Sequence, residues 1–340
     1  MPRATATAKP KTATKKTVAP KKVEKPKVKV VDEDEVYEED VVDSEEEETS
    51  ESEEEETPTV EIKKPTLKSD KKAVFKPSSK YIFEAHLTDN AIFRKLIDSV
   101  RDLVDNVTFD LSEDGIHLQA LDSNHVSLVN MALHRDGFEN YYCQRGISLG
   151  INLQSLTKIL KCARQNDKLI LQMDTNQEKL NVSFQSLESK RSSNFDIKLM
   201  DLDSEHLTIP EMEYDATVLV GSVEYQRTIH DLMTLGDNIT LEVDEDSFSL
   251  STKGDIGEGK IVLDRTDDEE NPSDESVHLK IDSPVTLTFS MKYLNNFCKA
   301  TPLSSHVLLS MKKDSPLVTE YQIPNLGYVK YFLAPKIDDE

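Results

Sequence analysis

The chain has 340 residues, of which 41 are Lys or Arg and 64 are Asp or Glu, so its formal net charge at pH 7 is −23. No apolar run approaches the roughly 18 residues of a transmembrane helix, and the charged N-terminus lacks the apolar segment of a secretory signal. Cys143, Cys162 and Cys298 form no CxxC pair. We therefore expect reduced thiols in a cytosolic or nuclear protein, without a disulfide framework or a zinc site.

Charge is segregated along the first 81 residues. Residues 1–30 carry a net charge of +9, residues 31–56 contain 17 acidic and no basic residues, and residues 57–81 carry a net charge of +5. Such blocks bury too little apolar surface to offset the entropy of ordering, so residues 1–81 are predicted to be a disordered charged tail. The basic arm is typical of nuclear targeting or of contact with DNA. A purely solubilising tail is an equally good interpretation.

An internal repeat occupies the rest of the chain. Residues 105–114 resemble residues 237–246 without a gap. Upstream of each segment, apolar residues recur at helical spacing, and downstream they alternate as in strands. The paired helical positions are Phe93, Ile97, Val100 and Leu103 in the first copy and Tyr225, Ile229, Leu232 and Leu235 in the second. The repeat predicts two similar domains.

In chain order, each copy is predicted to contain a helix, two or more strands, a second helix and further strands. The second helices are expected at 152–163 and 290–300, and the later strands include 168–173, 180–184, 307–311 and 328–333. This pattern indicates an α+β fold rich in antiparallel sheet. The predicted domains are residues 82–198 and 216–340, and the linker 199–215 between them is more apolar than a solvated linker requires.

Basic residues gather on the predicted helices. Residues 82–340 carry a net charge of −20, yet the second helix of each copy contains no acidic residue. Phosphate neutralisation needs such a positive surface and no sequence readout. Charge alone nevertheless favours ordinary solvated helix faces over a DNA-binding surface, because scattered lysines on helices are common.

Several longer motifs carry a family resemblance. They are IFEA at 82–85, LDSNHVSL at 121–128, KILKCA at 158–163, KLMDLD at 198–203, ATPLSS at 300–305 and LAPKI at 333–337. Together they resemble the proliferating cell nuclear antigen family, the DNA sliding clamps of eukaryotes and archaea. The resemblance is nearly collinear over 82–340. The charged N-terminal extension is not part of the usual pattern, and we interpret it as the mark of a divergent member from a protist or a large DNA virus.

The resemblance implies two clamp domains per chain, with antiparallel sheets outside and helices inside, and three chains joined head to tail in a closed ring. Such a ring holds duplex DNA by encirclement, so weak and sequence-independent phosphate contacts suffice. The residues that the resemblance assigns to DNA are Arg94, Lys95, Arg101, Lys158, Lys161, Arg227, Lys292 and Lys299. His230 stands where a basic residue is usual, which makes a weaker or pH-dependent contact the expectation.

The resemblance also implies a surface that docks short motifs of DNA polymerase, clamp loader and other replication and repair proteins. One aliphatic and two aromatic anchors of the partner enter it. Its residues are Leu121, His125, Val126, Leu128, Leu207, Ile209, Pro316, Phe332, Ala334 and Pro335. Without the resemblance, most of these residues taken singly would be interpreted as residues of the hydrophobic core. The subunit contact would join edge strands near 190–198 and 257–263.

Other classes of function are weighed against this interpretation. An enzyme is disfavoured because the sequence has no phosphate-binding loop and no clustered metal ligands, and the glycines at 254, 257 and 259 read as a turn. No cofactor is expected. A subunit of a heteromeric checkpoint-type clamp and a monomeric processivity factor remain open as alternatives. The expected location is the nucleus, or a cytoplasmic replication factory if the protein is viral, and no membrane association is expected.

Overall fold

The computed structural model describes residues 80–186, 189–202, 207–210, 212–266 and 276–336, all of which belong to the unit Lys68–Glu340. The predicted disordered tail lies outside the described residues except for its last two. Of these, Tyr81 is the first residue of a β-strand. The folded part therefore begins one residue earlier than the sequence predicts.

The first half of this unit begins with one strand and one helix and places its second helix after the sixth strand. Its elements are β1 (Tyr81–Leu87), α1 (Asn90–Val100), β2 (Asn106–Leu111), β3 (Gly115–Leu121), β4 (Ser127–His134), the 3-10 helix η1 (Arg135–Gly137), β5 (Asn140–Cys143), β6 (Ile147–Asn152), α2 (Leu153–Leu160), β7 (Asp167–Asp174), β8 (Lys179–Ser186) and β9 (Ser192–Lys198).

The second half repeats this order of strands and α-helices, as the internal repeat predicts. Its elements are β10 (Ala216–Gly221), α3 (Ser222–Leu232), β11 (Asn238–Val243), β12 (Ser247–Gly254), β13 (Gly257–Asp264), β14 (Val277–Ile281), β15 (Val285–Ser290), α4 (Met291–Phe297), the 3-10 helix η2 (Cys298–Leu303), β16 (His306–Met311), β17 (Leu317–Ile323) and β18 (Gly327–Leu333).

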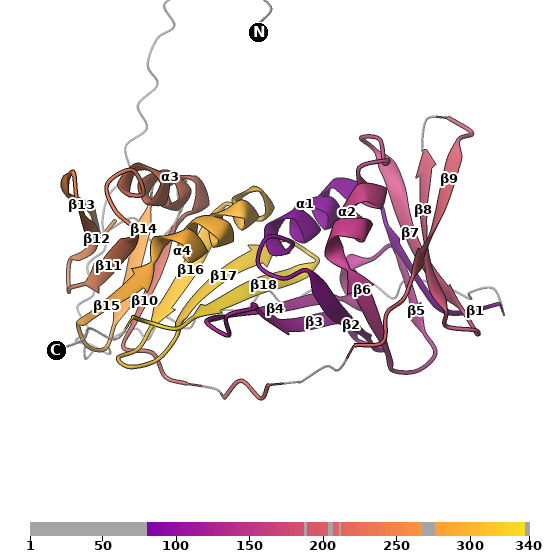
Figure 1. Cartoon of the computed structure of the whole chain (residues 1–340), viewed down its shortest axis with the longest axis horizontal. Helices are drawn as coiled ribbons and strands as arrows, with labels where there is room; N and C mark the ends of the chain where they lie inside the picture. Colours follow the sequence, from indigo (N-terminus) through magenta and orange to yellow (C-terminus); the bar gives the residue numbers. More distant parts are fainter. Residues whose placement is uncertain (1–79, 187–188, 203–206, 211, 267–275, 337–340) are drawn as a thin grey trace, which may run out of the picture. The chain divides into compact units, whose positions relative to one another are not determined.

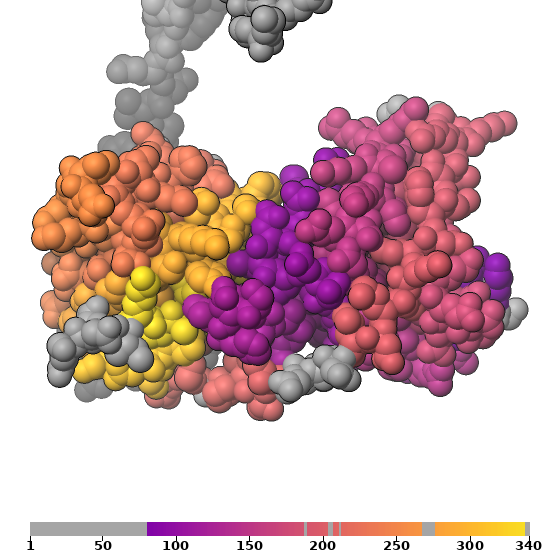
Figure 2. Space-filling model, viewed as in Figure 1, coloured from indigo at the N-terminus to yellow at the C-terminus, as the bar shows by residue number. Residues whose placement is uncertain are grey.

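Three antiparallel sheets carry the fold. Their strand orders are β5-β1-β7-β8-β9, β14-β10-β16-β17-β18-β4-β3-β2-β6 and β13-β12-β11-β15. The long sheet joins the two halves, because β18 pairs with β4 from Gly327 opposite Leu133 to Leu333 opposite Ser127. In Figure 2 the indigo-to-magenta surface of the first half lies directly against the orange-to-yellow surface of the second. The sheets and the few helices confirm the predicted α+β class.

The α-helices form a row on one face of the sheets (Figure 1), in which α2 contacts α1, α1 contacts α4 and α4 contacts α3. Apolar spacing explains the packing of α1, because Phe93, Leu96, Ile97 and Val100 all face the core. Side-chain caps begin two of the helices. The Asp89 carboxylate accepts from Ala91 N, and the Asn152 side chain accepts from Ser155 N.

Both second helices are shorter than predicted. Helix α2 ends at Leu160 rather than at residue 163, and α4 ends at Phe297 before continuing as η2. Pro302 lies inside η2 and has no N–H to donate to the Cys298 carbonyl one α-turn earlier. The Gln226 side chain donates to that carbonyl instead, over 3.0 Å. The 3-10 segment therefore has a local cause in the proline.

A buried aromatic pair and one hydrogen bond connect the two halves of the chain. The Phe297 and Tyr331 rings stack with their centroids 4.6 Å apart. Both residues belong to the second half, while the Tyr331 hydroxyl donates over 3.0 Å to Ser99 Oγ in α1 of the first. Tyr331 and Ser99 are fully buried. The helix row is therefore anchored to the long sheet from beneath.

Candidate nucleic-acid and partner-binding surfaces

The predicted DNA-binding cations all lie on or next to the helix row. The exposed ones are Arg94, Lys95, Lys158, Lys161, Arg227 and Lys292, while Arg101 and Lys299 are half-buried. Helical spacing explains this exposure. In α2, for example, Leu153, Leu156 and Leu160 are buried, which turns Lys158 towards solvent. His230 in α3 is exposed as well.

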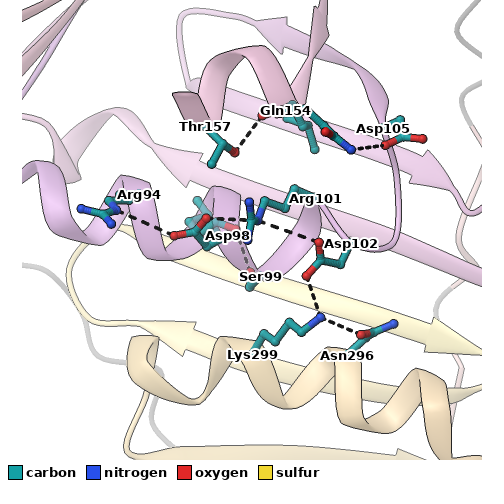
Figure 3. A network of polar contacts seen from close by, with 12 residues as sticks. Arg94, Asp98, Ser99, Arg101, Asp102, Asp105, Gln154, Thr157, Asn296 and Lys299 are labelled. Carbon is teal, nitrogen blue, oxygen red and sulfur yellow. Dashed lines mark hydrogen bonds and ion pairs between the residues drawn. The ribbon is translucent and has the colours of Figure 1, made fainter. Parts of the chain in front are cut away.

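Acidic neighbours engage half of these cations, and Figure 3 shows three of them, Arg94, Arg101 and Lys299. Asp98 Oδ2 lies 3.8 Å from Arg94 Nε, and Asp98 Oδ1 lies 3.2 Å from Arg101 Nε. Lys299 Nζ donates to Asp102 Oδ2 over 2.7 Å, which links η2 to the end of α1. In α3, Arg227 Nε lies 3.9 Å from Asp231 Oδ2. These carboxylates reduce the positive potential that the four cations present to solvent.

Three of the lysines form no ion pair with a carboxylate among the described residues. In the part of the chain that the structure describes, no ion pair is recorded for Lys158, Lys161 or Lys292. All three are exposed, and they belong to α2 or its C-cap and to α4, which contain no acidic residue. Lys95 donates only a long hydrogen bond of 3.4 Å to the Pro302 carbonyl. These lysines therefore supply most of the uncompensated positive charge on the helix row.

An apolar row crosses the face of the long sheet opposite the helices. Leu121 pairs with Leu128, Leu128 pairs with Phe332, and Phe332 pairs with Val318, so their side chains lie on one face of β3, β4, β18 and β17. Leu121, Leu128 and Phe332 are half-buried and Val318 is buried, while their strand neighbours Ser127, Val129, Tyr331 and Leu333 are fully buried. The structure thus brings three of the predicted partner residues together and adds Val318.

The remaining predicted partner residues border this row. Val126 is half-buried, and its carbonyl accepts from Ala334 N over 3.0 Å. His125 is exposed at the tip of the β3–β4 turn with φ of 56°. Pro316 is exposed directly before β17, and Pro335 is half-buried beyond β18. Leu207 and Ile209 belong to the linker; Leu207 is 41% exposed and Ile209 is half-buried.

Asp122 organises the turn that carries His125 and Val126. Its buried carboxylate accepts from Asn124 N, Val126 N and Ser127 N at 3.1, 2.8 and 2.7 Å, and from the Tyr293 hydroxyl at 2.8 Å. Burial raises the pKa of Asp122, but the hydrogen bonds together outweigh it and hold the pKa below its usual value. The turn is therefore built around an ionised carboxylate.

Sequence reasoning missed two of these contributors. Asp122 lies within the LDSNHVSL motif but has no predicted role there, and Gln119 has no predicted role either. Gln119 lies on β3 and hydrogen-bonds the Leu207 backbone 88 positions away. A signal for Asp122 exists in the sequence, since an Asp followed by Ser and Asn is typical of an Asx turn. No local pattern points to Gln119.

The described residues also bear on the glycine-rich segment, on metal ligands and on membrane-spanning helices. The glycines at 254 and 257 face each other in the β12–β13 hairpin, which confirms the predicted turn. Among the residues that the structure describes, no group of three or more His, Cys, Asp or Glu side chains is placed to hold a metal ion. None of the described helices has the length and apolarity to cross a membrane.

Comparison with known proteins agrees with this architecture. Residues 82–206 match the family described as "Proliferating cell nuclear antigen, N-terminal domain", and residues 208–336 match "Proliferating cell nuclear antigen, C-terminal domain". A "Proliferating cell nuclear antigen" from Chaetomium thermophilum is 44% identical over 259 residues, which cover 76% of this chain and 100% of the relative.

The repeated α+β halves and the lysine-bearing helix row define a DNA sliding clamp, the class of processivity factor that acts in DNA replication. The chain belongs to the proliferating cell nuclear antigen family. The family implies DNA and replication proteins as partners and a ring as the assembly, and its members are scaffolds rather than enzymes.

Proposed function

We propose that three copies of this chain close into a homotrimeric ring whose helix row faces duplex DNA. Within it, residues 82–198 and 216–340 act as the two clamp domains, and 199–215 is the connecting linker. The ring tethers DNA polymerase, clamp loader and repair proteins through the apolar row and the linker. The proposed location is the nucleus, or a cytoplasmic replication factory if the protein is viral.

The proposal of a ring is supported by two edge strands that are open for pairing with another copy. Strand β9 ends the five-stranded sheet and β13 ends the four-stranded sheet. Figure 1 places them at opposite ends of the helix row. An edge strand presents unpaired N–H and C=O groups that favour addition of a further strand. Pairing β13 of one copy with β9 of the next is a heterologous contact, and such contacts generate a ring when the rotation closes.

The uncompensated lysines are the single observation that carries the DNA contact. Lys158, Lys161 and Lys292 are exposed on acid-free helices of a body with a net charge of −20 over residues 82–340. A positive inner surface attracts phosphates without reading bases. The acidic remainder discourages binding of DNA to the outer surface. A few weak contacts suit a ring that has to slide.

The apolar row supports the partner site. Leu121, Leu128 and Phe332 present half-buried side chains on a sheet face whose neighbouring row is polar. Aliphatic and aromatic anchors of a short partner segment would cover that apolar surface. The turn of His125 and Val126 and the linker residues Leu207 and Ile209 border the surface from two sides.

The decisive experiment is topological. A loaded ring is expected to stay on a covalently closed plasmid and to leave the same plasmid after one cut. Equal loss from both forms contradicts encirclement. Size-exclusion chromatography with light scattering separates the alternatives, because a stable monomer opposes the homotrimer and trimer formation only with other chains indicates a checkpoint-type clamp.

A further inference from the structure

The Gln119 side chain binds the backbone of the linker at two points. Its Nε2 donates to the Leu207 carbonyl over 2.9 Å, and its Oε1 accepts from Leu207 N over 2.6 Å. One amide group thus satisfies both backbone groups of a single linker residue, in the way that a neighbouring strand would. The pairing fixes both the position and the orientation of the Leu207 peptide groups.

This anchor stands directly beside the apolar row. Gln119 and Leu121 are two residues apart on β3, so their side chains lie on the same face about 7 Å apart. Gln119 pairs with Asn130, and Asn130 pairs with Lys330, which forms a polar row parallel to that of Leu121, Leu128 and Phe332. The linker is therefore held at the border between a polar and an apolar strip.

The rest of the linker is anchored only at its ends, as far as the structure describes it. Met200 N donates to the Gly150 carbonyl over 2.8 Å at one end. At the other end, Asp215 Oδ2 accepts from Lys313 N over 2.8 Å. For the described residues between Asp201 and Tyr214, the recorded hydrogen bonds are those of Gln119 with Leu207. Among the described residues, the hydrogen bonds of the middle of the linker thus all involve the side chain of Gln119.

We propose that Gln119 is a positioning residue, which holds Leu207 and Ile209 at the edge of the apolar row and so sets the affinity for partner segments. The inference rests on the proposed partner site. Without the anchor, the linker samples other conformations, and the apparent affinity falls with the fraction of molecules in which the site is formed. The entropic cost of ordering the linker then falls on the binding reaction.

The test compares Gln119→Met, which keeps the length and removes both hydrogen bonds, with His117→Ala, an exposed position on the same face of β3. The probe is a synthetic peptide with one aliphatic and two aromatic anchors. We expect about five- to tenfold weaker binding for Gln119→Met and unchanged binding for His117→Ala. Gln119→Glu, which sets a carboxylate against the Leu207 carbonyl, serves as a second variant and should weaken binding in the same direction.

Hydrogen exchange gives a readout that does not depend on the peptide. The Leu207 amide is expected to be protected in the wild type and to lose protection in Gln119→Met, while the Met200 amide keeps its protection. An unprotected Leu207 amide in the wild type overturns the inference. So does unchanged peptide affinity in Gln119→Met when Phe332→Ala weakens binding. If Phe332→Ala also leaves the peptide affinity unchanged, the proposed location of the partner site is wrong, and the inference about Gln119 is wrong with it.

Discussion

Tyr293 in helix α4 donates its hydroxyl to the Asp122 carboxylate in the turn between β3 and β4, over 2.8 Å. The same hydroxyl accepts from Asn124 Nδ2 over 3.1 Å. The helix that carries Lys292 is thereby tied to the turn that carries His125 and Val126. The proposed DNA-facing surface and the proposed partner surface are consequently joined across the two halves of the chain through the Tyr293 hydroxyl.

The first prediction concerns the stability of this contact. Tyr293→Phe removes a hydrogen bond to an ionised acceptor and should lower the free energy of unfolding by about 1–2 kcal/mol, because bonds to charged groups exceed neutral ones in strength. Urea unfolding at fixed protein concentration measures it. Tyr142→Phe is the matched control, since Tyr142 is also half-buried and no hydroxyl hydrogen bond is recorded for it among the described residues. Equal effects of the two substitutions would contradict the prediction.

The second prediction concerns acid. Burial raises the pKa of Asp122, yet its hydrogen bonds prevail and the folded pKa lies below the usual 3.8. A carboxyl with a lowered folded pKa contributes stability above its unfolded pKa, and this contribution is lost as the pH falls through the folded value. Asp122→Asn should therefore be less stable than the wild type at pH 7.

The difference between wild type and Asp122→Asn should shrink as the pH falls from about 4, where the carboxyl of the unfolded chain takes up its proton, down through the lower pKa of the folded state. Urea midpoints measured between neutral and strongly acidic pH follow this convergence. The neutral Asn side chain supplies the pH-independent reference, so contributions from other carboxyls cancel in the comparison. A difference that stays constant over the whole range would show that the charge of Asp122 is irrelevant.

Much of the architecture is predictable from local periodicity. The apolar spacing of Phe93, Ile97 and Val100 places α1, and the matching set in the second copy places α3, because a buried helix face repeats every three or four residues. The later strands follow from alternation in the same way. Local patterns predict the ends of helices less well. The helix predicted to reach residue 300 ends at Phe297, because Pro302 favours the 3-10 segment η2 over a continued α-helix.

Long-range polar contacts could not be predicted from the sequence. Lys299 and Asp102 are 197 positions apart, and Tyr293 and Asp122 are 171 apart. Single polar side chains leave no periodic signal, and their partners are determined only once the sheets are assembled. The pairs of Arg94 and Arg101 with Asp98, and of Arg227 with Asp231, are three or four residues apart and follow from helical spacing. The pair of Lys299 with Asp102 depends on the assembled fold and has no such local signal.

The third prediction separates the free cations from the paired ones. Replacing Lys158, Lys161 and Lys292 with Ala should reduce polymerase stimulation strongly and make it fail at lower salt, because each phosphate contact that is lost weakens binding in a salt-dependent way. Replacing Arg94, Arg101 and Arg227 with Ala should have the smaller effect, since carboxylates already engage these side chains. Processivity assays over a salt series measure both variants, and light scattering checks that the assembly is intact. A larger loss in the arginine variant would reverse this assignment.

The fourth prediction concerns the linker side chains. Leu207→Ala combined with Ile209→Ala removes apolar surface beside the Leu121 row, and binding of a peptide with one aliphatic and two aromatic anchors should weaken several-fold. Titration calorimetry measures the affinity. Thr208→Ala, an exposed position between the two, is the matched control and should bind normally. If the double variant binds as tightly as the wild type, the linker does not border the partner site.

The fifth prediction concerns the ring. Val262 is 49% exposed on the edge strand β13, and we expect the neighbouring copy to cover it. Val262→Lys places a charge on this edge, which natural edge strands use to prevent pairing, and should shift the assembly from trimer to monomer in light scattering. The control is Val223→Lys, because Val223 is 65% exposed and lies on a helix, α3, rather than on an edge strand. A trimer that survives Val262→Lys at micromolar concentration would place the subunit contact elsewhere.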